Sequence, residues 1–268
     1  MYNTKMEVLL NKIVDQIDYL ISQLDNDNKV LGIGVSLPGI VSWPEGKLLT
    51  SPQLHWENVD IKKFFKEHFN YTVYVDNHVK TALMSESLFG SFINYKDVVC
   101  IYVGSGVGSS VMINGTILRG HDNTFGEIGH MTLKPDGPMC DCGRLGCLQT
   151  FLSSSEIEKQ TNKNIFEVLE SFNAGENWAE AIIERAKKYL ALMMSNVICI
   201  YNPQAILLTG SMIQTFPYLV ENIESIIDKQ VWHPLKSSYK IINKSFKEND
   251  EVIVASSLVM KEFLNYNL

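Results

Sequence analysis

Hydrophobic positions along the chain follow two spacings, one typical of helices and one of strands. Apolar residues from Met6 to Leu24 recur at steps of three and four, which predicts an amphipathic helix ended by the polar run at 25–29. The same spacing predicts the longest helix over 179–201. Shorter helices are expected over 61–68, after the serines at 153–155, and over 165–171.

Short apolar runs bounded by turn residues predict strands between these helices. They lie at 30–37, at 71–75, at 97–103 and between Pro203 and Gly210. The third strand leads into Gly104, Ser105 and Gly106. Glycines in such a loop let backbone N–H groups face an anion, and they equally well close a hairpin.

Composition narrows the class of protein. The chain has 268 residues, of which 46% are hydrophobic and 20% charged, which is typical of a globular protein with a sizeable core and two lobes. A net charge of −7 argues against binding nucleic acid. The best apolar run, at 189–201, is shorter than the roughly 20 residues of a membrane span. The N-terminus starts polar, so we expect no signal peptide, no membrane partner and a cytoplasmic location.

Side chains that can bind a metal ion are concentrated between Gly126 and Gln149. Cys140, Cys142 and Cys147 fall within eight residues, and with His130 they would form a closed four-ligand set for zinc. Buried thiols or a disulfide are the alternatives, although two cysteines one residue apart do not bridge easily. A lone histidine ten positions before the first cysteine is more often not a ligand. The remaining Cys100 and Cys199 lie in apolar runs, and we expect both to be core thiols.

The run GEIGHMTLKPDGPMCDCGRLGCLQ resembles the signature of the ROK family (repressors, open reading frames and sugar kinases). The resemblance implies an α/β protein with the two-lobed actin-like (ribonuclease H-like) sugar kinase fold. It also implies that His130 binds zinc and contacts a sugar hydroxyl, and that Glu127 holds another hydroxyl. Gln149 stands where the family has a sugar-binding glutamate. Because the amide accepts hydrogen bonds without charge, we expect this departure to change which sugar fits.

Two further segments resemble the sugar side of the family. The turn at Gly39 resembles one that lines the sugar cleft. In the family's kinases a strand ends in Asn-Asp, and here the matching residues are Asn77, a sugar contact, and His78 in the position of the catalytic base. An alignment shifted by one residue would instead give the base role to Asp76. A histidine differs from a carboxylate in reach and geometry, which argues against kinase activity.

The segments that resemble the family's nucleotide-binding motifs differ more from the family pattern. Gly104, Ser105 and Gly106 resemble the family's phosphate loop G-T-G-x-G. Gly210 is the one glycine kept from the adenosine-side segment, since Thr209 and Ser211 replace its neighbours. Added side chains intrude where backbone must approach a nucleotide. The magnesium- and phosphate-binding D-x-G-x-T motif is not found before Ile33. We therefore expect ATP and magnesium binding to be impaired.

Because the D-x-G-x-T motif is missing, the resemblance also predicts that one of the two lobes is incomplete. We expect an incomplete N-terminal lobe over 1–88 and 250–268, and a C-terminal lobe over 89–249 that carries the zinc motif at 130–147. No winged helix-turn-helix is found either, so DNA would be bound only through a domain absent from this chain. The family's usual homodimer is the expected assembly.

These features favour a sugar-sensing effector domain of a ROK regulator, most like the xylose repressors. A monosaccharide would bind between the lobes, zinc would be structural, and no phosphoryl transfer would occur. The alternative is an ATP-dependent hexose kinase of the glucokinase or fructokinase type, with His78 or Asp76 as base. A third interpretation is a degenerate remnant that zinc holds together.

Overall fold

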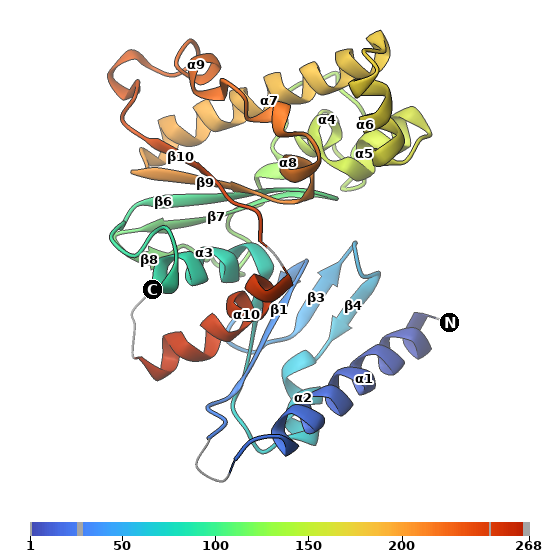
Figure 1. Ribbon diagram of the computed structural model, residues 1–268, viewed down its shortest axis with the longest axis vertical. Helices are drawn as coiled ribbons and strands as arrows, with labels where there is room; N and C mark the ends of the chain where they lie inside the picture. Colours follow the sequence, from blue (N-terminus) through green and yellow to red (C-terminus); the bar gives the residue numbers. More distant parts are fainter. Residues whose placement is uncertain (1, 26–28, 247, 265–268) are drawn as a thin grey trace. The chain divides into compact units, whose positions relative to one another are not determined.

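The computed structural model describes residues 2–25, 29–246 and 248–264, and the chain divides into two compact units. Unit 1 comprises Met1–Ser91, Arg119–Thr124 and Glu248–Leu268, and unit 2 comprises Phe92–Leu118 and Phe125–Lys247. Each unit is an α/β structure with its own hydrophobic core (Figure 1).

Unit 1 contains a parallel pair of strands and a small antiparallel sheet. Strand β1 (Ile33–Leu37) lies parallel to β5 (Val73–Asn77), with Leu37 opposite Asn77. The antiparallel sheet has the order β2-β3-β4. Its strands are β2 (Ile40–Val41), β3 (Leu48–Ser51) and β4 (Trp56–Val59). The helices of the unit are α1 (Tyr2–Ser22), α2 (Ile61–His68), α3 (His78–Phe89) and α10 (Glu248–Phe263).

Helix α1 confirms the first predicted helix, but its buried face matches only in part the predicted stripe of Met6, Leu9, Ile13, Ile17, Leu20 and Leu24. Leu10 and Val14, outside that stripe, are buried in the core, and Met6 and Ile17 of the stripe pack against it. Leu9 is 45% and Leu20 63% exposed. The N-terminal stretch is apolar on more than one side, so its spacing did not determine which side packs. Of the polar run expected to end this helix, residues 26–28 lie outside the described part of the chain.

Unit 2 is built on a five-stranded sheet of order β10-β9-β6-β7-β8. Strand β6 (Val98–Val103) is its centre, antiparallel to β7 (Val107–Ile113) and parallel to β9 (Ala205–Thr209). The edges are β8 (Thr116–Ile117) and β10 (Lys240–Asn243). Helix α7 (Asn177–Tyr201) runs along one face and supplies much of the core, including Leu190, Met194 and Ile198 (Figure 1).

The remaining elements of unit 2 are short helices. They are η1 (Ile128–His130), α4 (Gln149–Leu152), α5 (Ser154–Thr161), α6 (Ile165–Asn173), α8 (Ser211–Thr215), η2 (Pro217–Leu219), α9 (Ile223–Ile227) and η3 (His233–Leu235). Ser153 begins α5 as predicted, since its hydroxyl accepts a hydrogen bond from the Glu156 backbone N–H. No helix of the described residues is long and apolar enough to cross a membrane.

The two cysteines outside the central motif differ from each other. Cys100 is buried on β6, as expected, but Cys199 is exposed near the end of α7. The expectation that Cys199 is a core thiol is therefore wrong. The last turn of α7 buries Ile198 fully, whereas Cys199 and the next residue, Ile200, which is 61% exposed, lie on its exposed side.

Gly210 joins β9 to α8 and is required there by packing. Its φ of +109° lies in the left-handed region, and a Cβ at this position would collide with the Val103 carbonyl group of β6. Gly115, in the turn between β7 and β8, also has a positive φ, +75°, but a Cβ there would meet nothing within 4 Å. The two glycines thus share backbone strain and differ in the space around them.

We expect Gly210→Ala to destabilise unit 2 more than Gly115→Ala. Both variants incur left-handed strain of about 1–2 kcal/mol, and Gly210→Ala adds a collision worth about 1–3 kcal/mol. Urea denaturation followed by tryptophan fluorescence measures the difference. Equal losses of stability in the two variants would show that β6 does not require the glycine.

Candidate functional site

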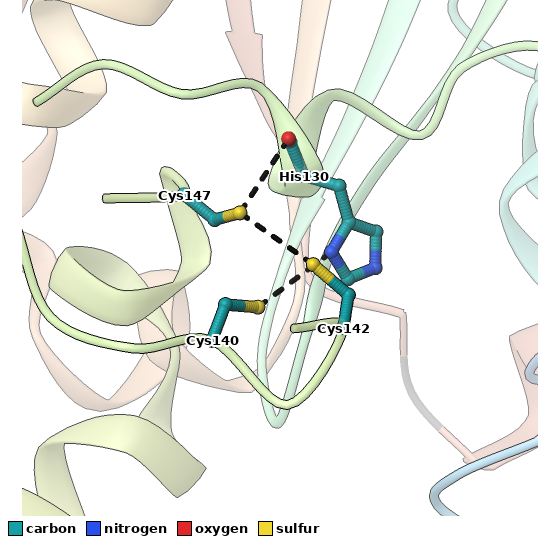
Figure 2. A group of neighbouring side chains, drawn as sticks. All are labelled: His130, Cys140, Cys142 and Cys147. Carbon is teal, nitrogen blue, oxygen red and sulfur yellow. Dashed lines mark hydrogen bonds between the residues drawn. The ribbon is translucent and has the colours of Figure 1, made fainter. Parts of the chain in front are cut away.

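Four predicted metal ligands converge in unit 2. His130 ends η1, Cys140 and Cys142 lie in the following loop, and Cys147 precedes α4. All four ligand atoms lie within 4.8 Å of one another (Figure 2). The His130 Nδ1 atom lies 3.7 Å from the Cys140 Sγ, and the Cys142 and Cys147 sulfurs are also 3.7 Å apart.

These separations fit a tetrahedral metal ion and exclude a disulfide in this structure. Zn–S bonds of about 2.3 Å and a Zn–N bond of about 2.0 Å imply edges of roughly 3.5–3.8 Å between ligand atoms. A disulfide would bring two sulfurs to about 2.05 Å. All three cysteines are free thiols, and the donor set is the soft sulfur and imidazole mixture that suits zinc.

Backbone geometry holds this loop in a narrow hairpin. Thr132 pairs with Cys147 and Met139 with Leu145 in isolated antiparallel bridges. Gly146 has a φ of +65°, and a Cβ there would collide with the Lys134 carbonyl oxygen. A glycine is therefore required immediately before the last cysteine.

Protonation of the thiols is uneven. Burial raises the pKa of Cys140, and it raises that of Cys147 to about 12. Burial also acts to raise the pKa of Cys142, but hydrogen bonds from the Arg144 backbone and the neighbouring cysteines outweigh it and lower the value. Since metals bind thiolates, loading of this site would release protons.

Two predicted sugar contacts lie together in unit 1. Asn77, at the end of β5, donates from Nδ2 to the Gly39 carbonyl oxygen at 2.9 Å. Its Oδ1 accepts from the backbone N–H groups of Val79 at 2.9 Å and Lys80 at 3.3 Å, and so caps α3. Asn77 therefore has a structural role whether or not a ligand binds.

Asp76 is engaged in a buried ion pair. Its fully buried carboxylate accepts from Arg119 Nη1 at 2.8 Å, from the Asn77 backbone at 2.8 Å and from Asn123 Nδ2 at 3.2 Å. The Arg119 guanidinium carbon lies 4.0 Å from the ring centre of Trp43. These contacts attach Arg119–Thr124 to unit 1, and they leave Asp76 poorly placed to take a proton from a substrate.

His78 begins α3 and is held neutral at pH 7. Burial lowers its pKa to about 4, and the charge of Lys80 acts in the same direction, against a backbone hydrogen bond with Leu37. Taking a proton would place a cation where burial and Lys80 both disfavour it. Neither candidate base is therefore well prepared for the role.

The predicted phosphate loop forms a hairpin turn between β6 and β7. The Gly104 N–H donates to the Gly106 carbonyl at 2.9 Å. The Gly104 and Ser105 carbonyls accept from the Ser154 N–H at 2.8 Å and the Ser155 hydroxyl at 2.6 Å. The loop is thus attached to the start of α5 through its backbone carbonyl groups.

The structure adds three residues of unit 1 that the sequence did not single out, and it shows the surroundings of the two remaining predicted sugar contacts in unit 2. Arg119, Asn123 and Lys80 form the surroundings of Asp76, with Lys80 Nζ donating to the Asn123 backbone oxygen at 2.9 Å. In unit 2, Gln149 lies against the metal ligands, with Nε2 3.3 Å from the Cys140 sulfur. Glu127 is exposed and precedes η1, three residues before His130.

Comparison with known proteins assigns nearly the whole chain to one family. The sequence model of the ROK family matches residues 2–262. The xylose repressor of Bacillus spizizenii is 27% identical over 265 residues, which cover 97% of this chain and 69% of the repressor.

Solved structures agree on the fold. A ROK family transcriptional regulator, a homologue of the Escherichia coli MLC protein, matches with a TM-score of 0.81 at 25% identity, covering 94% of this chain and 68% of that one. A ROK hexokinase from Thermus thermophilus matches with a TM-score of 0.75 at 20% identity, covering 88% and 81%. The predicted α/β, actin-like fold is confirmed.

We expect Cys147→Ser to lose bound metal, because three ligands hold an ion far more weakly than four. The fall in affinity should exceed the roughly 10–100-fold that follows loss of a residue supporting a ligand. Elemental analysis of the purified protein measures the content. Cys199→Ser is the matched control, since that thiol lies outside the cluster. Full metal content in Cys147→Ser would contradict the site.

We expect His78 to make stability depend on pH. Its folded pKa of about 4 lies below the unfolded value of 6.5, so the unfolded chain binds more protons between them. Stability should fall below pH 6.5 by up to ~1.4 kcal/mol per pH unit from this residue. Denaturation curves of wild type and His78→Gln measure this slope. An unchanged slope in His78→Gln would refute the assignment.

Proposed function

The chain belongs to the ROK family, and from that premise we propose that it is the sugar-sensing effector domain of a ROK transcriptional regulator. The observation that carries the proposal is that the metal and sugar motif is kept while the base position offers no available carboxylate. The likeness to a xylose repressor over 97% of the chain supports the regulator side. Binding without phosphoryl transfer is the function that this combination favours.

We propose zinc as the ion, held by His130, Cys140, Cys142 and Cys147. Four protein ligands close the coordination sphere, so the ion would shape the loop and take no part in a reaction. Because His130 turns Nδ1 toward the cysteines, its Nε2 is left for another partner (Figure 2). That second nitrogen is the atom proposed to meet a sugar hydroxyl.

The proposed effector is a monosaccharide. The residues that match the family's sugar contacts are Glu127, His130 and Gln149 in unit 2, and Asn77 and Gly39 in unit 1. A carboxylate, an imidazole and amides are the kinds of groups that fix hydroxyl orientation. The identity of the sugar depends on the effect of Gln149, which lacks the charge of a glutamate.

Two partners complete the proposal. A second copy of the chain would form a homodimer, and DNA would be bound by residues other than these, since an acidic chain repels phosphate.

A hexose kinase remains the second candidate, because the fold is shared with a ROK hexokinase. Its difficulty lies in Asp76, which is paired with Arg119, and in the hairpin at Gly104 to Gly106.

We expect Glu127→Gln to lose the effector response and keep its metal. Replacing one charged acceptor of a hydroxyl costs about 1.5–3 kcal/mol, or roughly 10–150-fold in affinity. Thermal unfolding with a panel of xylose, glucose and N-acetylglucosamine measures the response as a rise in Tm. Glu170→Gln, on α6 of the same unit, should respond like wild type.

Two results would contradict the proposal. A wild-type protein whose Tm rises with none of these sugars would not be a sugar sensor of this kind. Release of ADP from ATP in the presence of one sugar would favour the kinase, and His78→Gln and Asp76→Asn would then identify the base.

A further inference from the structure

Gln149 makes a contact that the metal ligands alone do not explain. It is the first residue of α4, two positions after Cys147, and its Nε2 lies 3.3 Å from the Cys140 sulfur. Among the described residues it is the one side chain outside the cluster with a nitrogen or oxygen donor bonded to a cluster sulfur. Arg144, the nearby cation, donates instead to the His130 carbonyl and the Thr132 hydroxyl, at 3.2 Å each.

The chemistry of a metal-bound sulfur fixes the direction of this bond. A thiolate accepts hydrogen bonds and cannot donate them, so only the NH₂ end of the amide can face it. Three thiolates and one divalent cation leave the site with a net negative charge. A donor aimed at one sulfur disperses part of that charge, and a hydrogen bond to a charged acceptor is stronger than one between neutral groups.

We propose that Gln149 is a positioning residue of the metal centre, which orients the Cys140 thiolate and withdraws charge from it. The inference rests on the proposed metal site and adds a role that is separate from sugar binding. A glutamate, which the family carries at this position, could not make this contact, because an ionised carboxylate has no N–H to donate to the sulfur.

The two roles of Gln149 are compatible. The amide has a donor end and an acceptor end, and the contact with Cys140 uses one of its two N–H groups. Its carbonyl oxygen can still accept a sugar hydroxyl. A single side chain would then contact both the metal loop and the effector.

The test uses Co²⁺ as a probe in the whole chain. The sulfur-to-cobalt charge-transfer band reports the charge on the thiolates, and the ligand-field bands report the tetrahedral geometry. In Gln149→Leu we expect the charge-transfer band at lower energy, because an unbonded thiolate gives up electrons more readily, with the ligand-field bands in place. Gln149→Glu cannot donate to the sulfur either, so we expect the same shift of the charge-transfer band as in Gln149→Leu. Gln214→Glu adds the same charge at an exposed position of α8 and should match wild type.

The possible outcomes separate this inference from the metal site itself. A wild-type protein that binds neither Co²⁺ nor Zn²⁺ would overturn the metal site and the inference with it. A wild type that binds Co²⁺, with Gln149→Leu and Gln149→Glu unchanged in spectrum, would overturn the inference alone. Shifted ligand-field bands in Gln149→Leu would mean a collapsed site, and the proposal would fail as a statement about one hydrogen bond.

Discussion

The convergence of one imidazole and three thiols is the constraint on which the loop between His130 and Cys147 depends. Between His130 and Cys147 the chain forms only isolated bridges, and side chains such as Met139 and Leu145 are 64% and 45% exposed. Apolar burial therefore stabilises this segment little. A metal ion held by the four ligand atoms, which lie within 4.8 Å of one another, would supply the missing cross-link, as metals do in small loops with little core.

Unit 1 has an electrostatic constraint of a different kind. The Asp76–Arg119 pair is sheltered from water, with side-chain exposures of 0% and 18%. Removing one partner of such a pair leaves an uncompensated buried charge, which costs about 3–5 kcal/mol. The same carboxylate also accepts from the Asn77 backbone, so the end of β5, the cap of α3 and the Arg119–Thr124 segment are stabilised together. A carboxylate committed in this way serves the fold rather than a reaction.

Local sequence signals predicted the parts of the site that are local. The close spacing of three cysteines and the glycines between them predicted the metal cluster, and periodicity predicted α7 and β6. Contacts across the chain were not predictable in this way. Asp76 and Arg119 are 43 positions apart, and nothing in either neighbourhood indicates the other. The predictions of which side of α1 is buried and of a buried Cys199 failed for a related reason. The chain has more apolar residues than its core can bury, so apolar character alone does not show which of them are exposed.

A residue kept from a catalytic motif is weak evidence for catalysis when the fold requires it anyway. A side chain at Gly210 would collide with the Val103 carbonyl group, so the fold requires this glycine. It would persist in a protein that has lost nucleotide binding. Departures are more informative, since the fold did not require them. His78 replaces a carboxylate where burial opposes charge, and Gln149 replaces one beside a thiolate. Each change replaces a carboxylate of the family pattern with a neutral side chain, and the change at position 78 is the one that supports the proposed binding function over phosphoryl transfer.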